Sequence, residues 1–185
     1  LGKTIENLCE STTRYAGNST INETSYEDKI VSVIATEGSL VYPFKLTKQL
    51  QNGKKYFVYC PWNCSNSAHI FTGAFRMSYN GNDTFGKQNT FIDNKKYIIF
   101  TIDEKEQINP YTHFTIGRHG SVPVNTTLTF YRPILCEYEP GMENWDWESI
   151  GYFTGTKNIG NEFIKVSNSD ATKYNSLYIT KDQPI

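Results

Sequence analysis

Residues 29–62 read KIVSVIATEGSLVYPFKLTKQLQNGKKYFVYCPW, and this stretch decides the fold class. It contains three runs rich in Val, Ile, Tyr and Phe, namely Lys29–Thr36, Leu40–Leu46 and Lys55–Trp62. Such residues favour the pleated, half-buried surface of a β-strand. A Glu-Gly-Ser turn sequence separates the first two runs, and an Asn-Gly pair, a strong hairpin signal, precedes the third. The stretch therefore predicts antiparallel strands joined by tight turns.

The same pattern continues through the middle of the chain. Strand starts recur at spacings of roughly 10–15 residues, which is typical of an antiparallel sandwich and too short for βαβ units. No stretch shows a sustained helical period with caps, and we expect one helical turn at most, over residues 103–109 before Pro110. The further predicted strands are Ile70–Tyr79, Tyr97–Ile102, Thr112–Gly117 and Thr126–Glu137.

Composition supports this class and excludes others. Aromatic residues make up 15% of the 185 residues, and turn-forming residues are plentiful, which favours strands and turns over helices. The formal net charge is −1, so the basic excess usual in nucleic-acid-binding proteins is missing. No run of 18 apolar residues predicts insertion into a membrane, and no signal peptide is recognisable. Because the chain begins at Leu1, we expect it to be a piece of a longer protein.

The character of the sequence changes after Pro140 and Gly141. Met142–Glu148 is acidic and aromatic, and short strands are predicted further on at Phe163–Val166 and Ser176–Thr180. We expect a lead-in over residues 1–19, a sandwich domain over 20–140, and a β-rich C-terminal connector or the start of a next domain over 141–185. The two tryptophans of the acidic stretch, Trp145 and Trp147, are expected to cover the junction with the connector.

Four cysteines occur, and their spacing does not point to a metal. Cys60, Cys64 and His69 have a spacing that matches no trusted zinc pattern. We interpret these two cysteines, with Cys9 and Cys136, as thiols packed on strands, although a disulfide stays open and the redox compartment is undecided.

Several segments resemble carbohydrate-binding jelly-roll modules, of families 4 and 9 and of the galactose-binding-like kind. Tyr26–Trp62 resembles the first half of such modules, with Leu50–Tyr56 (LQNGKKY) matching a characteristic strand start. Tyr97–Ile102 and Thr126–Pro140 are similar to later strands of the second half. The resemblance implies a jelly roll that binds sugars without catalysis.

One departure from that family concerns calcium. Many such modules carry an Asp in the last strand, where it helps hold a structural calcium. The corresponding stretch here, Phe130–Ile134, reads FYRPI and has no Asp. We therefore expect no cofactor, because the missing Asp puts the structural calcium of the family in doubt.

Two further sequence segments indicate the kind of protein to which this chain belongs. Leu1–Leu8 (LGKTIENL) resembles the opening of tail proteins of phages that infect Gram-positive bacteria, and Gly151–Gly160 (GYFTGTKNIG), with Tyr174–Ile185 after it, is similar to a connector of the same proteins. This resemblance implies a phage or prophage tail or baseplate protein that recognises its host. The implied partners are cell-surface polysaccharide and other tail subunits, with a homo-oligomer possible. The implied location is the virion tail or the extracellular surface of a cell.

Residues suited to sugar recognition occur in three places. Aromatic rings pack against the C–H faces of sugars, while Arg and His supply directional hydrogen bonds to hydroxyls. Arg76 alternates onto one strand face with small residues, and His113 shares its face with Thr115 and Gly117. Each candidate also has an ordinary interpretation, as a core ring or as part of a solvated face. The predicted carbohydrate-binding residues are Trp62, His69, Arg76, Tyr79, Tyr111, His113 and Arg118.

We expect no enzymatic activity. No Gly-x-Ser-x-Gly motif occurs, and the histidine spacing does not fit the helical pair of metalloproteases. The carboxylate clusters adjoin predicted turns, where a solvated face is the ordinary interpretation. Two other functions stay open: a structural interaction module of a tail assembly without affinity for glycans, and a lectin-like module attached to a secreted bacterial enzyme. A broad apolar patch without a cleft would favour the structural role.

Overall fold

The structure is a computed structural model, and it describes residues 2–10, 18–68, 71–79, 82–90, 96–102 and 111–164. Strands dominate these residues, and the one α-helix among them, α1 (Trp147–Ile150), is a single turn. Two 3-10 turns, η2 (Met142–Asn144) and η3 (Asn161–Phe163), flank it in sequence. Within the described chain, no helix has the length and apolar character that a membrane span requires.

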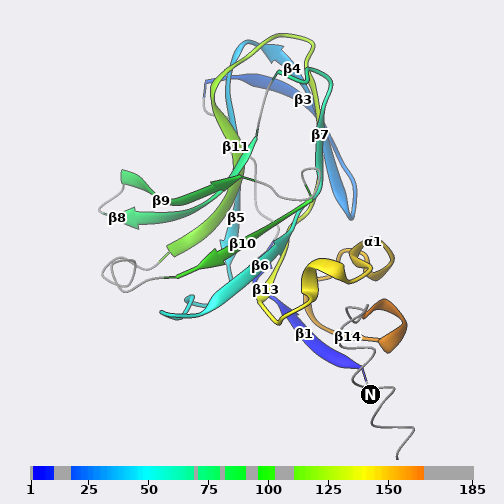
Figure 1. Ribbon diagram of the computed structural model, residues 1–185. Coiled ribbons are helices and arrows are strands. Elements are labelled where there is room, and N and C mark those ends of the chain that lie inside the picture. Colours follow the sequence, from blue (N-terminus) through cyan, green and yellow to red (C-terminus); the bar gives the residue numbers. More distant parts are fainter. Residues whose placement is uncertain are drawn as a thin grey trace, which may run out of the picture.

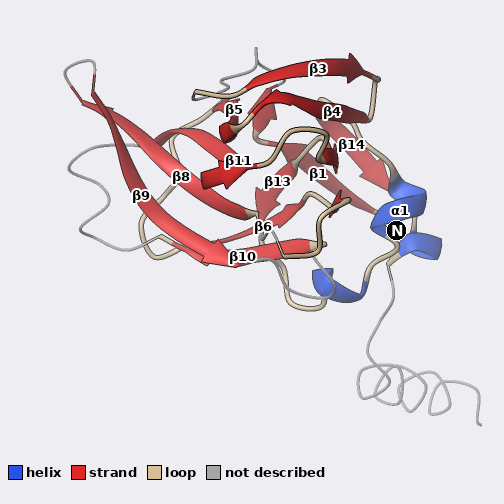
Figure 2. Cartoon of the chain, turned by 90° about the horizontal axis from the view of Figure 1, so that it is seen from above, coloured by secondary structure: helices blue, strands red, loops and turns tan. Residues whose placement is uncertain are grey.

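The strands form an antiparallel fold (Figures 1 and 2). A five-stranded sheet has the order β2-β5-β11-β8-β9, a four-stranded sheet the order β3-β4-β12-β7, and a three-stranded sheet the order β10-β6-β13, while β1 pairs with β14. The strands are β1 (Lys3–Asn7), β2 (Cys9–Glu10), β3 (Thr20–Ser25), β4 (Lys29–Thr36), β5 (Gly38–Leu46), β6 (Lys55–Tyr59), β7 (Trp62–Cys64), β8 (Thr72–Tyr79), β9 (Asn82–Thr90), β10 (Tyr97–Thr101), β11 (Tyr111–Val122), β12 (Thr127–Tyr131), β13 (Ile134–Glu137) and β14 (Gly155–Ile159).

The three-stranded and four-stranded sheets are two halves of one bent layer. Only Cys60 and Pro61 separate β6 from β7, while Arg132 and Pro133 separate β12 from β13. The register moves by one residue across this break, from Ile134 opposite Tyr59 to Phe130 opposite Trp62. One extra residue on the β12–β13 side therefore forms a bulge, and the two prolines, which donate no backbone hydrogen bond, lie at it.

Joined in this way, the strands have the connectivity of a jelly roll. Numbered along the chain, the long strands of the described residues are β4, β5, β6–β7, β8, β9, β10, β11 and β12–β13. One layer contains the first, eighth, third and sixth of them in spatial order, and the other contains the second, seventh, fourth and fifth. This interleaving is the double Greek key of the jelly roll. The predicted fold class, an all-β antiparallel sandwich of jelly-roll type, is confirmed.

The main core fills the space between the two layers. Inward positions alternate along β4 and β5, where Ile30, Ile34, Leu40 and Phe44 are almost completely buried. Tyr42 packs on Phe130 with ring centroids 4.5 Å apart, and this contact joins the two layers directly. Burial of apolar surface at about 25 cal/mol per Å² is the main source of stability for such a core.

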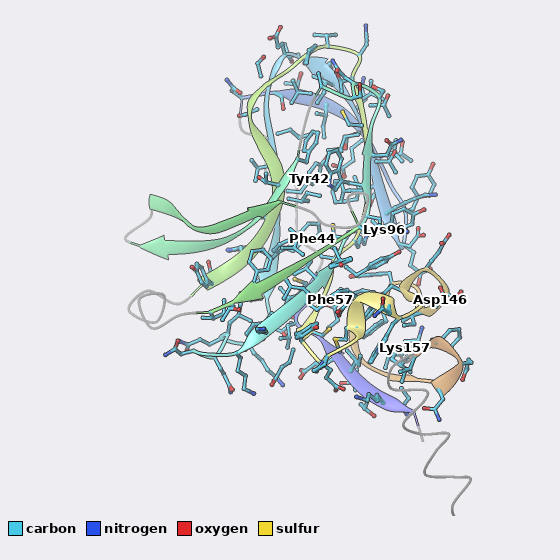
Figure 3. All side chains as sticks on the ribbon, in the orientation of Figure 1. Tyr42, Phe44, Phe57, Lys96, Asp146 and Lys157 are labelled. Atoms are coloured by element: carbon cyan, nitrogen blue, oxygen red, sulfur yellow. The ribbon has the colours of Figure 1, made fainter. Side chains whose placement is uncertain are left out.

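A second core lies on the outer face of the β6–β13 layer, where residues 141–164 pack. Phe57, which is fully buried, stacks on Trp147 with centroids 5.0 Å apart, and Trp147 stacks on Trp145 at 5.5 Å. Figure 3 shows Phe57 on β6 beside the segment that carries α1 and Asp146. The prediction that both tryptophans cover the junction with the C-terminal segment is confirmed.

Several elements differ from the sequence-based expectation. β1, β2, β3, β9 and β14 were not predicted, because they lack the dense β-branched and aromatic runs of the central strands. Phe163 ends a 3-10 turn, where a strand was expected. β11 extends through Val122 with an irregular register after Arg118, so the expected loop after residue 117 is part of a strand. The helical turn predicted over residues 103–109 and the strand at 176–180 lie outside the described residues.

All four cysteines are buried and unbridged, which agrees with packed thiols. Burial raises the pKa of the Cys60 thiol and raises the pKa of the Cys136 thiol to about 12. Because the thiolate is the reactive form, these side chains behave as small apolar groups at neutral pH.

The side chain of Asn7 connects three parts of the chain that are distant in sequence. Its amide Nδ2 donates to the backbone oxygen of Pro133 at 3.1 Å and to that of Phe153 at 2.8 Å. Its Oδ1 accepts from the backbone N–H of Cys9 at 3.1 Å and of Leu135 at 3.0 Å. Asn7 is 1% exposed, so these bonds form out of reach of water.

We predict that Asn7→Ala lowers the free energy of unfolding by about 2–4 kcal/mol, because buried backbone donors and acceptors then lack partners. Asn7→Asp is expected to be at least as damaging, since a carboxylate cannot donate to the carbonyls of Pro133 and Phe153. Urea unfolding measures both, with the exposed Asn63→Ala on β7 as the matched control. An Asn7→Ala variant as stable as the control would contradict this role.

Candidate functional site

The candidate site lies on the outer face of the five-stranded sheet. The backbone register places His113 on β11 opposite Lys45 on β5 and opposite Arg76 on β8. On its other side, Lys45 is opposite Glu10 of β2. Neighbouring strands are about 4.8 Å apart, so these four positions form a row of about 14 Å that crosses the sheet. Residues with basic side chains thus occupy three adjacent positions of one row.

Among the described side chains on the outward face of β5 and β11, exposure differs along the strands. Val41 and Thr115, which occupy outward positions further along β5 and β11, are 1% and 2% exposed. Lys45 is exposed and His113 is partly exposed. Of these positions, Lys45 at the end of β5 is the most exposed, and it lies opposite His113.

A shallow, open depression of about 470 Å³ adjoins this pair. The hydroxyl of Thr112 lies 2.8 Å from Nδ1 of His113, a contact that orients the imidazole ring. Tyr111 is 5% exposed and joins the depression to the main core. The residues around the depression are Lys45, Leu46, Thr47, Lys48, Gln49, Tyr111, Thr112 and His113.

This arrangement suits binding through hydrogen bonds. Lysine supplies three donors, imidazole a donor and an acceptor, and the Gln49 amide supplies both. Lys48 is also paired with Glu6 at 2.6 Å, whereas Lys45 forms no ion pair among the described residues. No group of three or more His, Cys, Asp or Glu side chains capable of holding a metal occurs in the described chain.

Trp62, predicted as a binding residue, lies in the core. It is 6% exposed, and its ring meets that of Phe71 edge to face at 5.2 Å. β7 pairs with the central strand β12 of the opposite layer, which turns the indole inward. This burial argues against the predicted contact between Trp62 and a ligand and supports the alternative interpretation of Trp62 as a core ring.

The other predicted residues divide into two groups. Tyr111 and His113 are brought together at the depression, and Arg76 is brought next to His113 in the register. Tyr79 ends β8 three residues beyond Arg76, at the end of the strand that pairs with Tyr111 and His113, whereas Arg118 lies on β11 opposite Leu40, away from the depression. His69 lies outside the described residues. The backbone register therefore places Arg118, but not Tyr79, at the other end of the sheet from the Lys45–His113 pair.

The sequence-based search missed Lys45, Lys48 and Gln49. The alternation of the run Leu40–Leu46 carries a signal for Lys45, since Leu40, Tyr42, Phe44 and Leu46 alternate inward and leave position 45 outward. No comparable signal marks Lys48 and Gln49, because they follow the strand and their position depends on the path of the loop.

We predict that Trp62→Ala lowers the free energy of unfolding by about 3–5 kcal/mol, through the cavity it leaves in the core. The conservative Trp62→Phe should lose less stability and keep ligand binding in the folded fraction. Urea unfolding and binding to cells test the pair. If the Trp62→Phe variant folds but no longer binds cells, Trp62 contacts the ligand, as the sequence analysis predicted.

Comparisons with known proteins show similarity at the level of structure only. No protein-family model and no curated protein matches the sequence. A solved structure described as "CBM4 structure and function" is 11% identical, covers 66% of this chain and 80% of its own, and has a TM-score of 0.48. An accessory secretory protein complex from Streptococcus pneumoniae contains a chain that is 15% identical, with coverages of 74% and 96% and a TM-score of 0.44. A family 29 carbohydrate-binding module is 8% identical, with coverages of 74% and 89% and a TM-score of 0.39.

Proposed function

We propose that this chain is a non-catalytic carbohydrate-binding module that recognises a cell-surface polysaccharide with the end of its five-stranded sheet that carries Lys45 and His113. The observation that carries the proposal is the Lys45–His113–Arg76 row beside the depression. Donors held on strands keep a fixed spacing, which suits a ligand whose hydroxyls repeat at regular intervals. The family resemblance of the strand sequences supports the same function.

The described surface gives less support to a purely structural role. The large hydrophobic side chains exposed on the described residues are Tyr26, Val124 and Tyr131. A subunit interface usually requires a contiguous apolar patch with buried aromatic anchors. Three such residues do not form a broad patch, so a module that acts only by packing against neighbouring subunits is the second choice.

The wider setting is part of the proposal and rests on sequence resemblance alone. The opening phrase Leu1–Leu8 and the phrase Gly151–Gly160 support a phage or prophage tail or baseplate protein, located on the virion tail and directed at a Gram-positive host. In that setting, other tail subunits and further copies of the chain are the expected partners. A weak single site, with a dissociation constant on the order of 0.1–1 mM, would then act through many copies on one particle.

The test is binding of the chain, as a multimerised fluorescent fusion, to Gram-positive cells with and without their cell-wall polysaccharide. We expect binding that disappears with the polysaccharide. We also expect Lys45→Ala and His113→Ala each to weaken binding about tenfold, since a hydrogen bond to a charged group contributes roughly 1.5–3 kcal/mol.

Lys55→Ala is the matched control, because Lys55 is an exposed strand lysine on the opposite layer. It should bind as the unsubstituted chain does. Equal loss in Lys45→Ala and Lys55→Ala would show that binding reflects total charge and not this site. If the folded fusion binds to no cell, carbohydrate binding is contradicted and the structural role becomes the preferred function.

A further inference from the structure

A second pocket lies on the opposite layer, where residues 141–164 meet the jelly roll. It measures about 210 Å³ and is bounded by the bulged break between β12 and β13, by β6 and by α1. No predicted site residue lies in it. Its walls join strands of the sandwich to the C-terminal segment, so the pocket exists only because that segment is packed on the sheet.

Aromatic rings in fixed positions form one side of this junction pocket. Tyr59 is half-buried and stacks on Trp147, with ring centroids 5.9 Å apart and planes 23° apart. Trp147 is itself held between Phe57 and Trp145, and its Nε1 donates to the backbone oxygen of Met142 at 2.6 Å. Tyr131 is 41% exposed at the edge of the pocket. These rings are ordered before any ligand arrives, which reduces the entropic cost of binding.

Polar groups of both signs complete the lining. Asp28 and Glu148 contribute carboxylates, while Lys96 and Arg132 contribute cations. Among the described residues, the side chains of Asp28, Glu148 and Lys96 form no ion pair with one another. Figure 3 labels Lys96 and Asp146, which lie on the jelly-roll side and the C-terminal side of this junction.

The basic side chain of Arg132 is positioned by its neighbours. Its Nε donates to the backbone oxygen of Tyr26 at 3.1 Å, and its Nη2 donates to the Ser25 hydroxyl at 2.7 Å. Its backbone N–H donates to the backbone oxygen of Asp28 at 2.8 Å. The guanidinium is thus fixed at the pocket, as a preorganised binding group should be.

We infer that the junction pocket is a second ligand site, one that binds a single neutral sugar ring. The two carboxylates and two cations balance, so the lining offers no net field to an anion or to a cation. A neutral ring with one apolar face and several hydroxyls uses all of these groups at once. The apolar face packs on the tyrosines, while the hydroxyls donate to the carboxylates and accept from the cations.

A further observation supports this ligand class. An adjoining depression of about 210 Å³ shares Tyr59, Lys96, Trp147 and Glu148 with the pocket and gives room for a second ring. Each depression is smaller than the 300–1,000 Å³ typical of larger ligands, which suits one ring in each.

The junction pocket is tested on the full chain by NMR, with the indole resonance of Trp147 as the reporter. The probes are the methyl glycosides of glucose, galactose, N-acetylglucosamine and rhamnose, with tetramethylammonium and inorganic phosphate as charged comparisons. We expect at least one glycoside to shift the Trp147 resonance at millimolar concentration. Tyr131→Ala and Glu148→Gln should each weaken that response about tenfold.

Tyr26→Ala is the matched control for Tyr131→Ala. Both tyrosines are exposed and both rings lie near the ammonium of Lys29, at 5.3 and 5.9 Å, but only Tyr131 lines the pocket. The control should respond as the unsubstituted chain does. A Trp147 resonance that no glycoside shifts, or that shifts more with tetramethylammonium or phosphate, would overturn the inference.

The two proposed sites fail separately. Lys45→Ala and His113→Ala lie on the other layer and should leave the Trp147 response unchanged. If they abolish it, the junction pocket is not an independent site. If those variants lose cell binding but keep the Trp147 response, the junction pocket is a ligand site independent of the Lys45–His113 pair.

Discussion

The buried carboxamide of Asn7 is the constraint on which the arrangement of the chain depends. Its four hydrogen bonds reach the β12–β13 break, the start of β2 and the C-terminal segment at Phe153. Only an amide offers donors and acceptors in this combination, and a buried group left unpaired costs more than a bond contributes. The bulge, which would otherwise leave backbone groups unpaired inside the protein, is therefore completed by a side chain from the N-terminal strand. The C-terminal segment is fixed to the sandwich by the same amide.

The hydrogen bonds of Asn7 help hold together two segments that lie far apart in the sequence. Leu1–Leu8 supplies β1 and Asn7, while Gly151–Gly160 supplies Phe153 and β14, and the two strands pair directly. Gly2 lies so close to the Ile159 carbonyl that a Cβ there would collide with it. Lys157 adds a bond from its ammonium to the backbone oxygen of Ile150, 2.5 Å away. The two segments thus form one structural unit.

The fold class was predictable because the alternation of apolar and polar residues is visible within the sequence of each central strand. Alternation in Lys29–Thr36 and Leu40–Leu46 places one face of each strand inward whatever the partner strand is. β1, β9 and β14 could not be predicted in this way, since their extended form depends on pairing with strands elsewhere. The proposed site follows the same rule: His113 and Arg76 were predicted from alternation, whereas the positions of Lys48, Gln49 and the junction pocket depend on the paths of loops and of a segment distant in sequence. For Trp62, the sequence left a ligand contact and a core ring both open, because an aromatic residue at the end of a strand fits either role, and its burial supports the core ring.

The bulge between β12 and β13 determines where the junction pocket forms. Pro61 and Pro133 interrupt the β6–β7 and β12–β13 strands, and Tyr59, Tyr131 and Arg132 gather beside this break. The C-terminal segment covers the adjacent β6–β13 surface with its tryptophans, so rings and charges come together at the edge of the covered area. In the five-stranded sheet, β5 and β11 pair in regular register from His113 to Arg118, while the pairing of β8 with β11 shifts by one residue between Tyr111 and His113. The proposed polysaccharide site and the proposed junction site belong to different layers, so occupation of one does not block the other.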